Sequence, residues 1–233
     1  MRNRPKPAFT LMETVIAIGV LAVLITSFLA VFGPATQEIR RSINLQDADR
    51  LVATLEKEMS IQRDPGGGGS GATTAFDKAF EWIREAGKGE LIMLYQYRGD
   101  PDAVRSDGTM DPYTTRDGIA GQDYVVQSMA RLRSDTLFLD DLEAVQGRVF
   151  GVQTEQLVFN GGELRPGTAG EIREMNGGGA AASASEYPDG VIAFSAKFYP
   201  LASSSATFLG PGGQLKIENL GKPVFTRNLG VRR

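Results

Sequence analysis

The chain has 233 residues, a formal net charge of −3 and 42% hydrophobic residues, which suit one anchoring helix and one globular domain with its own core. It contains no cysteine, which excludes disulfides, thiol nucleophiles and thiolate metal sites. It contains no histidine, the commonest general base and metal ligand. No large basic block follows the first six residues, so the sequence predicts no nucleic-acid partner. We therefore expect a non-catalytic protein without a cofactor.

A long apolar segment follows a short basic N-terminus. The first six residues include three cations and no acid. The apolar run from Val15 to Phe32 is interrupted only by one threonine and one serine. Residues 9–32 would form about 36 Å of helix, enough to cross a hydrocarbon core of about 30 Å. Cations favour the cytoplasmic side of a membrane, so the remainder of the chain is expected on the far side.

A single acid, Glu13, stands near the start of this segment. An ionised side chain costs roughly 2.5–3.5 kcal/mol at the centre of a bilayer and less near its surface. One interpretation is an incidental acid whose side chain reaches the lipid headgroups. The residues around Glu13 favour a different interpretation.

Residues 8–13, AFTLME, resemble the cleavage and methylation motif of type IV prepilins and type II secretion pseudopilins. In that family a membrane peptidase cuts after a small residue, usually glycine, and methylates the amine of the phenylalanine that follows. A glutamate shortly after the cut then pairs with the N-terminal amine of a neighbouring subunit. The resemblance implies cleavage between Ala8 and Phe9, methylation of Phe9 and an assembly role for Glu13. It is strong over residues 6–32 and weak over 33–62.

The resemblance also implies a fold and a function. The implied fold class is α+β: a pilin-like long N-terminal helix, transmembrane and then amphipathic, packed on an antiparallel β-sheet. Its parts would be a leader at 1–8, a transmembrane assembly helix at 9–33, an amphipathic half at 34–62 and a globular domain at 72–233. The chain would be a subunit, a minor pilin or pseudopilin, of a type IV pilus or a type II secretion-like pseudopilus. Its implied partners are the prepilin peptidase, other pilin or pseudopilin subunits and the inner membrane, with the globular domain in the periplasm and the protein in the filament after assembly.

Three other interpretations fit parts of the same pattern. A secretory signal peptide fits less well, because the apolar run exceeds the usual length of about 7–15 residues and an acid interrupts its start. A single-pass anchored binding protein that never polymerises would make Glu13 incidental. An anchored hydrolase would need a pair such as Asp140 and Asp141, but adjacent side chains point apart, so this pair is expected on a solvated surface.

Residues 35–62 predict a helix with one apolar face. Apolar residues recur at three- and four-residue steps: Ile39, Ile43, Ala48, Leu51, Val52, Leu55 and Met59. Pro34 predicts a kink before this part and residues 64–66 predict its end, which gives one bent helix of about 50 residues. A coiled-coil stalk is the alternative, but the stripe lacks three clean heptads.

The rest of the chain predicts a short helix and a series of strands. A glycine-rich connection at 65–71 precedes a helix that is expected to end at Gly87. The expected strands are 90–98, 124–133, 148–153, 156–160, 163–165, 190–199, 214–219 and 223–227, with a short helix or loop at 135–146. Short connections favour an antiparallel sheet with the N-terminal helix on one face. Residues 167–187 predict a mobile surface excursion.

A turn-rich segment at 99–121 is rich in aspartate, and four of its aspartates stand out: Asp100, Asp102, Asp107 and Asp111. Some pseudopilins hold calcium in a loop, so these side chains are candidate ligands. Their spacing does not match an EF-hand, and aspartate beside proline or glycine is ordinary turn chemistry. The pattern favours turns over a calcium site.

Overall fold

The computed structural model describes residues 10–62, 74–210 and 212–233. The chain divides into two units, residues 1–44 and 45–233, which are described separately. Helix α1 (Leu11–Met59) contains residues of both units, and its 49 residues confirm the single helix of about 50 residues predicted across Pro34. The kink at Pro34 stays a prediction.

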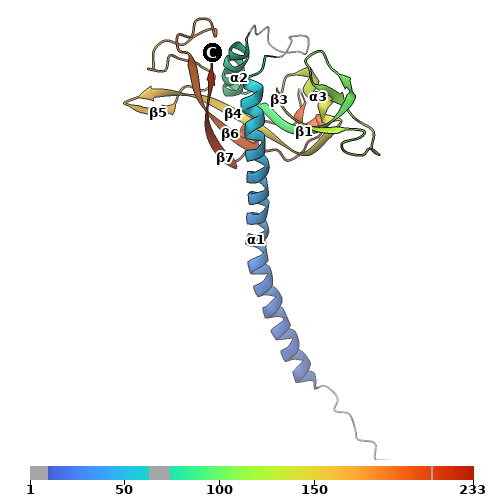
Figure 1. The fold of residues 1–233 in the computed structure, drawn as a ribbon. Coiled ribbons are helices and arrows are strands. Elements are labelled where there is room, and N and C mark those ends of the chain that lie inside the picture. The colour runs from blue at the N-terminus through green and yellow to red at the C-terminus, as the bar shows by residue number, and fades with distance from the viewer. Residues whose placement is uncertain (1–9, 63–73, 211) are drawn as a thin grey trace, which may run out of the picture. The chain divides into compact units, whose positions relative to one another are not determined.

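The elements after α1 form an α+β domain (Figure 1). In chain order they are α2 (Ala75–Lys88), β1 (Ile92–Val104), β2 (Met110–Pro112), β3 (Val125–Leu132), α3 (Thr136–Leu142), β4 (Val145–Asn160), β5 (Glu163–Pro166), β6 (Val191–Pro200), α4 (Ala206–Leu209), the short 3-10 helix η1 (Ile217–Asn219) and β7 (Phe225–Arg232). The predicted class, helix with antiparallel sheet, is confirmed at this level.

Within the described residues, seven strands form the sheet and all of their pairings are antiparallel. The main path runs β3-β1-β4-β6-β7, while β2 pairs with the end of β1 and β5 with the end of β4. β4 is one continuous strand of 16 residues, so its predicted division into two strands is wrong. It turns into β5 through Gly161 and Gly162, whose φ angles of 63° and 85° are readily adopted only by glycine.

One face of the sheet is covered by α2 and by the part of α1 that belongs to the second unit. Leu51, Leu55 and Met59 of α1 are buried, with exposed fractions of 4%, 0% and 1%. The predicted apolar face is therefore confirmed over this part of the helix. Ile39 and Ile43, which the same stripe included, belong to the first unit and are exposed.

Helix α2 begins with a side-chain cap and ends at a glycine. The amide of Asp77 donates to Oγ1 of Thr74 (3.1 Å), and Gly89, at φ 122°, follows the last helical residue, Lys88. Gly87, predicted to end the helix, lies within it instead. A Cβ at Gly87 would collide with the backbone nitrogen of Gly170, so this glycine permits a close approach between the helix and a loop.

The loop at 167–187 packs on the same core, which corrects its prediction as a surface excursion. Ile172, Ala184 and Tyr187 are buried in the cluster beneath α1 and α2. The side-chain amide of Gln156 donates to the carbonyl of Arg173 and accepts its amide N–H, both at 2.7 Å. A strand residue thus replaces the backbone partner that a neighbouring strand would supply.

The opposite face of the sheet is also covered near β1 and β3, whereas the sequence predicted cover on one face only. A second cluster of buried side chains lies there, with members from the strands, from α3 and α4, and from the segment that precedes η1. They are Leu91, Met93, Tyr95, Tyr97, Met129, Phe138, Leu142, Val149, Leu209 and Leu215. Residues 217–219, predicted to lie in an edge strand, form η1 within this layer. The short polar-looking segments after β6 are therefore part of the core.

The guanidinium of Arg133 joins this second layer to the sheet. It donates to the carbonyls of Leu209, Gly210 and Leu215, at 2.7, 2.9 and 3.1 Å. These three carbonyls lie in segments without regular strand pairing, so the arginine supplies donors that the backbone lacks there.

Replacing Arg133 with Ala is expected to lower the free energy of unfolding by about 2 kcal/mol, because three carbonyls lose a charged donor. Amide exchange in residues 206–219 should accelerate most. Chemical unfolding and hydrogen exchange of the full chain in detergent measure both effects. Arg165→Ala is the control, since Arg165 makes an ion pair with Glu163 in which both side chains are more than 60% exposed. Equal effects of the two variants would contradict the proposed support.

Candidate functional site

The first turn of α1 holds Glu13, the predicted assembly acid. The amide of Glu13 donates to Oγ1 of Thr10 at 3.3 Å, and the carbonyl of Thr10 accepts the amide of Thr14 at 3.2 Å. Thr10 thus caps the helix, and the Thr-x-x-Glu spacing is that of a capping box. An acid in a first turn is also favoured by the helix dipole. The structure gives Glu13 a local role that the sequence interpretation did not include.

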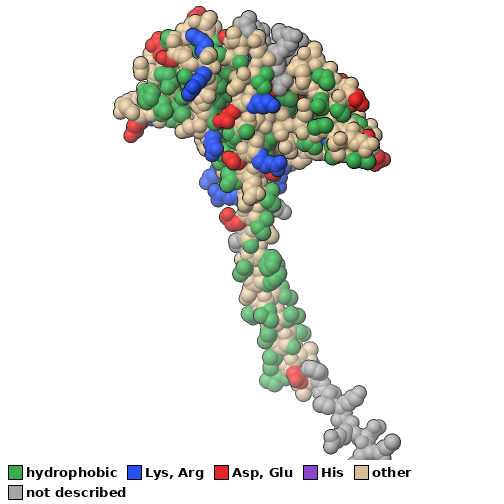
Figure 2. Space-filling model, in the orientation of Figure 1, with side chains coloured by type: hydrophobic (Ala, Val, Ile, Leu, Met, Phe, Trp, Pro, Cys, Tyr) green, Lys and Arg blue, Asp and Glu red, His purple; other side chains and the backbone are tan. Residues whose placement is uncertain are grey.

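The helix that follows Glu13 is long and apolar enough to cross a membrane, by length and composition. This segment, Leu11–Phe32, has a mean hydropathy of 2.8 and is the one helix of this kind in the described part of the chain. Its side chains are exposed, and Figure 2 shows hydrophobic groups along its visible side. A signal sequence shares these properties, so the apolar helix alone does not decide between anchor and signal.

The two residues of the predicted cleavage site, Ala8 and Phe9, lie outside the described residues. Cleavage between them and methylation of Phe9 therefore stay predictions. Glu13 is described, and its side chain is exposed in the first turn of the helix.

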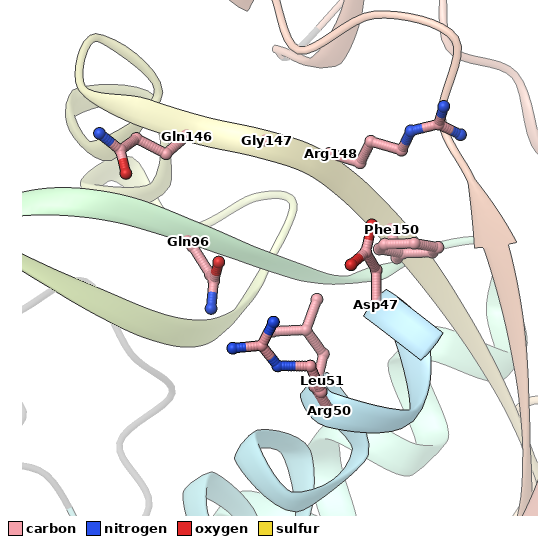
Figure 3. Close-up of a pocket in the computed structure, with 8 residues that line it drawn as sticks. All are labelled: Asp47, Arg50, Leu51, Gln96, Gln146, Gly147, Arg148 and Phe150. Atoms are coloured by element: carbon pink, nitrogen blue, oxygen red, sulfur yellow. The ribbon is translucent and has the colours of Figure 1, made fainter. Parts of the chain in front are cut away.

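A small hollow lies where α1 meets β1 and β4 in the second unit (Figure 3). It measures about 90 Å³, well below the roughly 300–1,000 Å³ of small-molecule sites. Its lining residues are Asp47, Arg50, Leu51, Gln96, Gln146, Gly147, Arg148 and Phe150. Arg50 and Gln96 approach it from helix and strand, whereas Arg148 and Gln146 point away. The hollow is a gap in helix packing with polar walls.

A buried ionic network lies under the second face of the sheet, and Asp141 is its centre. The Asp141 side chain is fully buried; it accepts hydrogen bonds from Arg105 at 2.7 Å, from Arg131 at 3.2 Å and from the hydroxyl of Tyr95. Asp140, its neighbour in α3, is exposed. The predicted solvated pair is therefore wrong for Asp141, since the turn of the helix sends one carboxylate inward and the other outward.

Arg131 extends the network to two further carboxylates. Its guanidinium contacts Asp107 at 3.0 Å and Asp135 at 3.2 Å, in addition to Asp141. Burial opposes ionisation of Asp107, but hydrogen bonds from Thr109 and Arg131 outweigh it and lower the pKa of Asp107. Burial, reinforced by the charge of Asp141, raises the pKa of Tyr95 well above its ordinary value. These groups are satisfied by one another, as expected for a structural network.

The four candidate calcium ligands do not converge. Asp107 is paired with Arg131, and Asp111 with Arg105 at 2.7 Å. One oxygen of Asp100 accepts the amide of Asp102 at 2.9 Å, the turn chemistry expected of such aspartates. Across residues 10–62, 74–210 and 212–233, no group of three or more carboxylates is placed to hold a metal.

The sequence interpretation missed the ionic network, although β3 carried a signal for it. Arg131 lies two positions after Met129 in the strand, so both side chains point to the same face of the sheet. Both residues are buried. An arginine on a buried face requires carboxylates nearby.

Comparisons with protein-family models, with curated proteins and with solved structures found no match to this chain.

Proposed function

We propose that this chain is a non-catalytic filament subunit of the type IV pilus or type II secretion pseudopilus class, cut before Phe9 and assembled through its N-terminal helix. The observation that supports this most is Glu13, an acid in the first turn of a helix that is apolar and exposed through Phe32. A carboxylate is costly in such a segment unless a cation neutralises it.

The proposed cut would supply that cation. Cleavage before Phe9 creates an ammonium close to Glu13 in sequence, and in a filament the ammonium of one subunit would meet the carboxylate of another. In a layer of low dielectric each charge alone is unfavourable, whereas the pair is stabilised. Such pairing would favour one axial register between neighbouring helices. The last part of α1, whose residues Leu51, Leu55 and Met59 pack on the sheet, suits a helix that carries a folded domain on the filament.

Mass spectrometry of the membrane fraction tests the processing step. The expected dominant species begins at a methylated Phe9 when the chain is produced together with a prepilin peptidase. Ala8→Gly, which restores the residue usual in the family, should be cut at least as completely, and Ala8→Glu should remain uncut. A chain that keeps Met1 in all three forms, or that begins near Thr36, would overturn the proposal.

An anchored binding protein that never polymerises is the second candidate. The hydrogen bond between Thr10 and Glu13 favours it, because helix capping explains Glu13 without assembly. Shearing separates the two functions: a filament subunit appears in the sheared fraction, and an anchored protein stays entirely in the membrane pellet.

A further inference from the structure

Strand β7 forms an open edge of the sheet. It pairs with β6 over eight consecutive residues without a register shift, from Val191↔Arg232 to Phe198↔Phe225, and its other side has no strand partner among the described residues. Open edges are commonly protected by proline, charged side chains, a bulge or short length. β7, with the sequence FTRNLGVR, has eight residues, no proline and no bulge, so Arg227 and Arg232 are the only such features that it carries.

The backbone groups of β7 that point outward can be assigned from its pairing. The amide of Arg233 donates to the carbonyl of Gly190 at 2.9 Å, so the pair Val191↔Arg232 is of the non-hydrogen-bonded kind. By alternation, the N–H and C=O groups of four residues point away from β6, and all four residues are exposed. They are Thr226, Asn228, Gly230 and Arg232.

At the opposite end of the sheet, β3 also has eight residues, but its edge is less accessible. In β3, Met129 and Ala130 are only 3% and 1% exposed, so a large part of that edge is covered. β7 is therefore the edge that an extended chain can reach along most of its length.

Gly230 is a position in β7 where the rest of this chain does not require glycine. An added Cβ at this position would meet only the carbonyl of Ile192 and a methyl of Val191, each at 3.8 Å. Its φ angle is not in the left-handed region, so neither space nor conformation inside this chain requires glycine. Glycine within a strand weakens it and often marks the close approach of a ligand or another backbone.

The charges near this edge select the partner. Residues 221–233 contain four cations and no acid. Arg227 is 55% exposed and lies 3.7 Å from Asp49, also exposed, and Arg232 is exposed without an ion pair in the described part of the chain. Two copies of β7 would bring like charges together, which disfavours self-pairing.

We propose that β7 is a docking strand for an extended acidic segment of another protein, which adds to the sheet beside it. Backbone hydrogen bonds to Thr226, Asn228, Gly230 and Arg232 would supply the affinity, and carboxylates near Arg227 and Arg232 the specificity. This inference does not depend on assembly into a filament.

Arg227 and Arg232 are five positions apart in the strand, so their side chains lie on opposite faces of the sheet. The test therefore uses the full chain in detergent and a fluorescent extended peptide that repeats Val-Val-Glu-Glu, which places glutamates on both faces and is long enough to span the strand. Fluorescence anisotropy should show saturable binding. The same peptide with lysine in place of glutamate, or with its backbone amides methylated on one edge, should bind roughly tenfold more weakly. Hydrogen exchange should slow at the outward amides of Asn228 and Arg232, while the amides of Leu229 and Val231, already bonded to β6, should change little.

Asn228→Pro removes one outward donor without breaking the β6 ladder, and Asn228→Thr is its matched control. The proline variant should bind roughly tenfold more weakly and the threonine variant like the parent. If the proline variant unfolds at a lower temperature, Arg232→Gln replaces it, with weaker binding and a smaller salt dependence expected. The proposal is overturned if the parent does not bind the acidic peptide, or if methylation of the peptide backbone has no effect on binding. It is also overturned if Asn228→Pro abolishes self-association of the protein and leaves peptide binding unchanged, or if duplex DNA binds the edge more tightly than the peptide does.

Discussion

Replacing Glu13 with Gln is expected to remove the chain from sheared filaments while leaving its membrane insertion and its cleavage before Phe9 intact. Glutamine keeps the size of the side chain and its hydrogen-bonding capacity but removes the charge. The N-terminal ammonium of a neighbouring subunit would then lack its counter-ion in a layer of low dielectric. Immunoblots of the sheared and membrane fractions, together with the mass of the processed chain, measure the effect.

Thr10→Ala is the control that separates assembly from helix capping. It removes the hydroxyl that accepts the amide of Glu13 and keeps the carboxylate. Loss of a cap costs about 0.5–2 kcal/mol in helix stability, which a helix held by lipid tolerates, so incorporation should stay close to that of the parent. Normal incorporation of Glu13→Gln would contradict the assembly role. Equal losses in both variants would assign Glu13 to capping.

Replacing Asp141 with Asn should destabilise the domain by about 3–5 kcal/mol, because Arg131 and Arg105 would each lose a buried counter-charge. The hydroxyl of Tyr95 would also lose its carboxylate acceptor. Chemical unfolding of the full chain in detergent, followed by tryptophan fluorescence, gives the free energy of unfolding.

The neighbouring substitution Asp140→Asn is a matched control for this prediction. Asp140 belongs to the same short helix, and its substitution is the same chemical change, but its side chain is exposed. Little change in stability is expected. If both substitutions destabilise the protein equally, the loss comes from α3 itself and not from the buried network.

The parts of the structure that could be predicted depend on residues close together in the sequence. The apolar run to Phe32, the stripe through Leu51 and Leu55, and the turn at Gly161 each carry their signal within a few residues. The same holds for the predicted site, since Ala8, Phe9 and Glu13 form one contiguous motif. Their chemistry depends on a peptidase and on other subunits, so the fold of one chain does not test it.

The parts that were missed depend on contacts between distant residues. The predicted strands 148–153 and 156–160 leave out residues 154 and 155, yet Thr154 is buried within β4 with an exposed fraction of 0%, and Gln156, the first residue of the second predicted strand, is buried with an exposed fraction of 2%. The hydroxyl of Thr154 donates to the carbonyl of Ile83, and Gln156 is bonded to Arg173. A polar side chain on a buried face is tolerated when a distant segment satisfies it, and the local pattern cannot show that segment.

The burial of Asp141 has the same origin. Two adjacent aspartates are equivalent in the sequence, and the position of Arg131 on a different element decides which of them is inside. The layer that covers the second face of the sheet was missed for a related reason. Leu209 and Leu215 lie in segments too short to show the hydrophobic periodicity of a helix or a strand.

The continuity of β4 has a consequence for how the domain unfolds. Its first half is bonded to β1 and contributes Val149 to the core of one face, and Phe150 and Val152 to the core of the other face. From Phe150 onward the strand is bonded to β6, and its last four residues to β5. Neither core can lose its order without disturbing the strand on which the other is built. Residues 45–233 should therefore melt in a single calorimetric transition whose enthalpy agrees with the van't Hoff value.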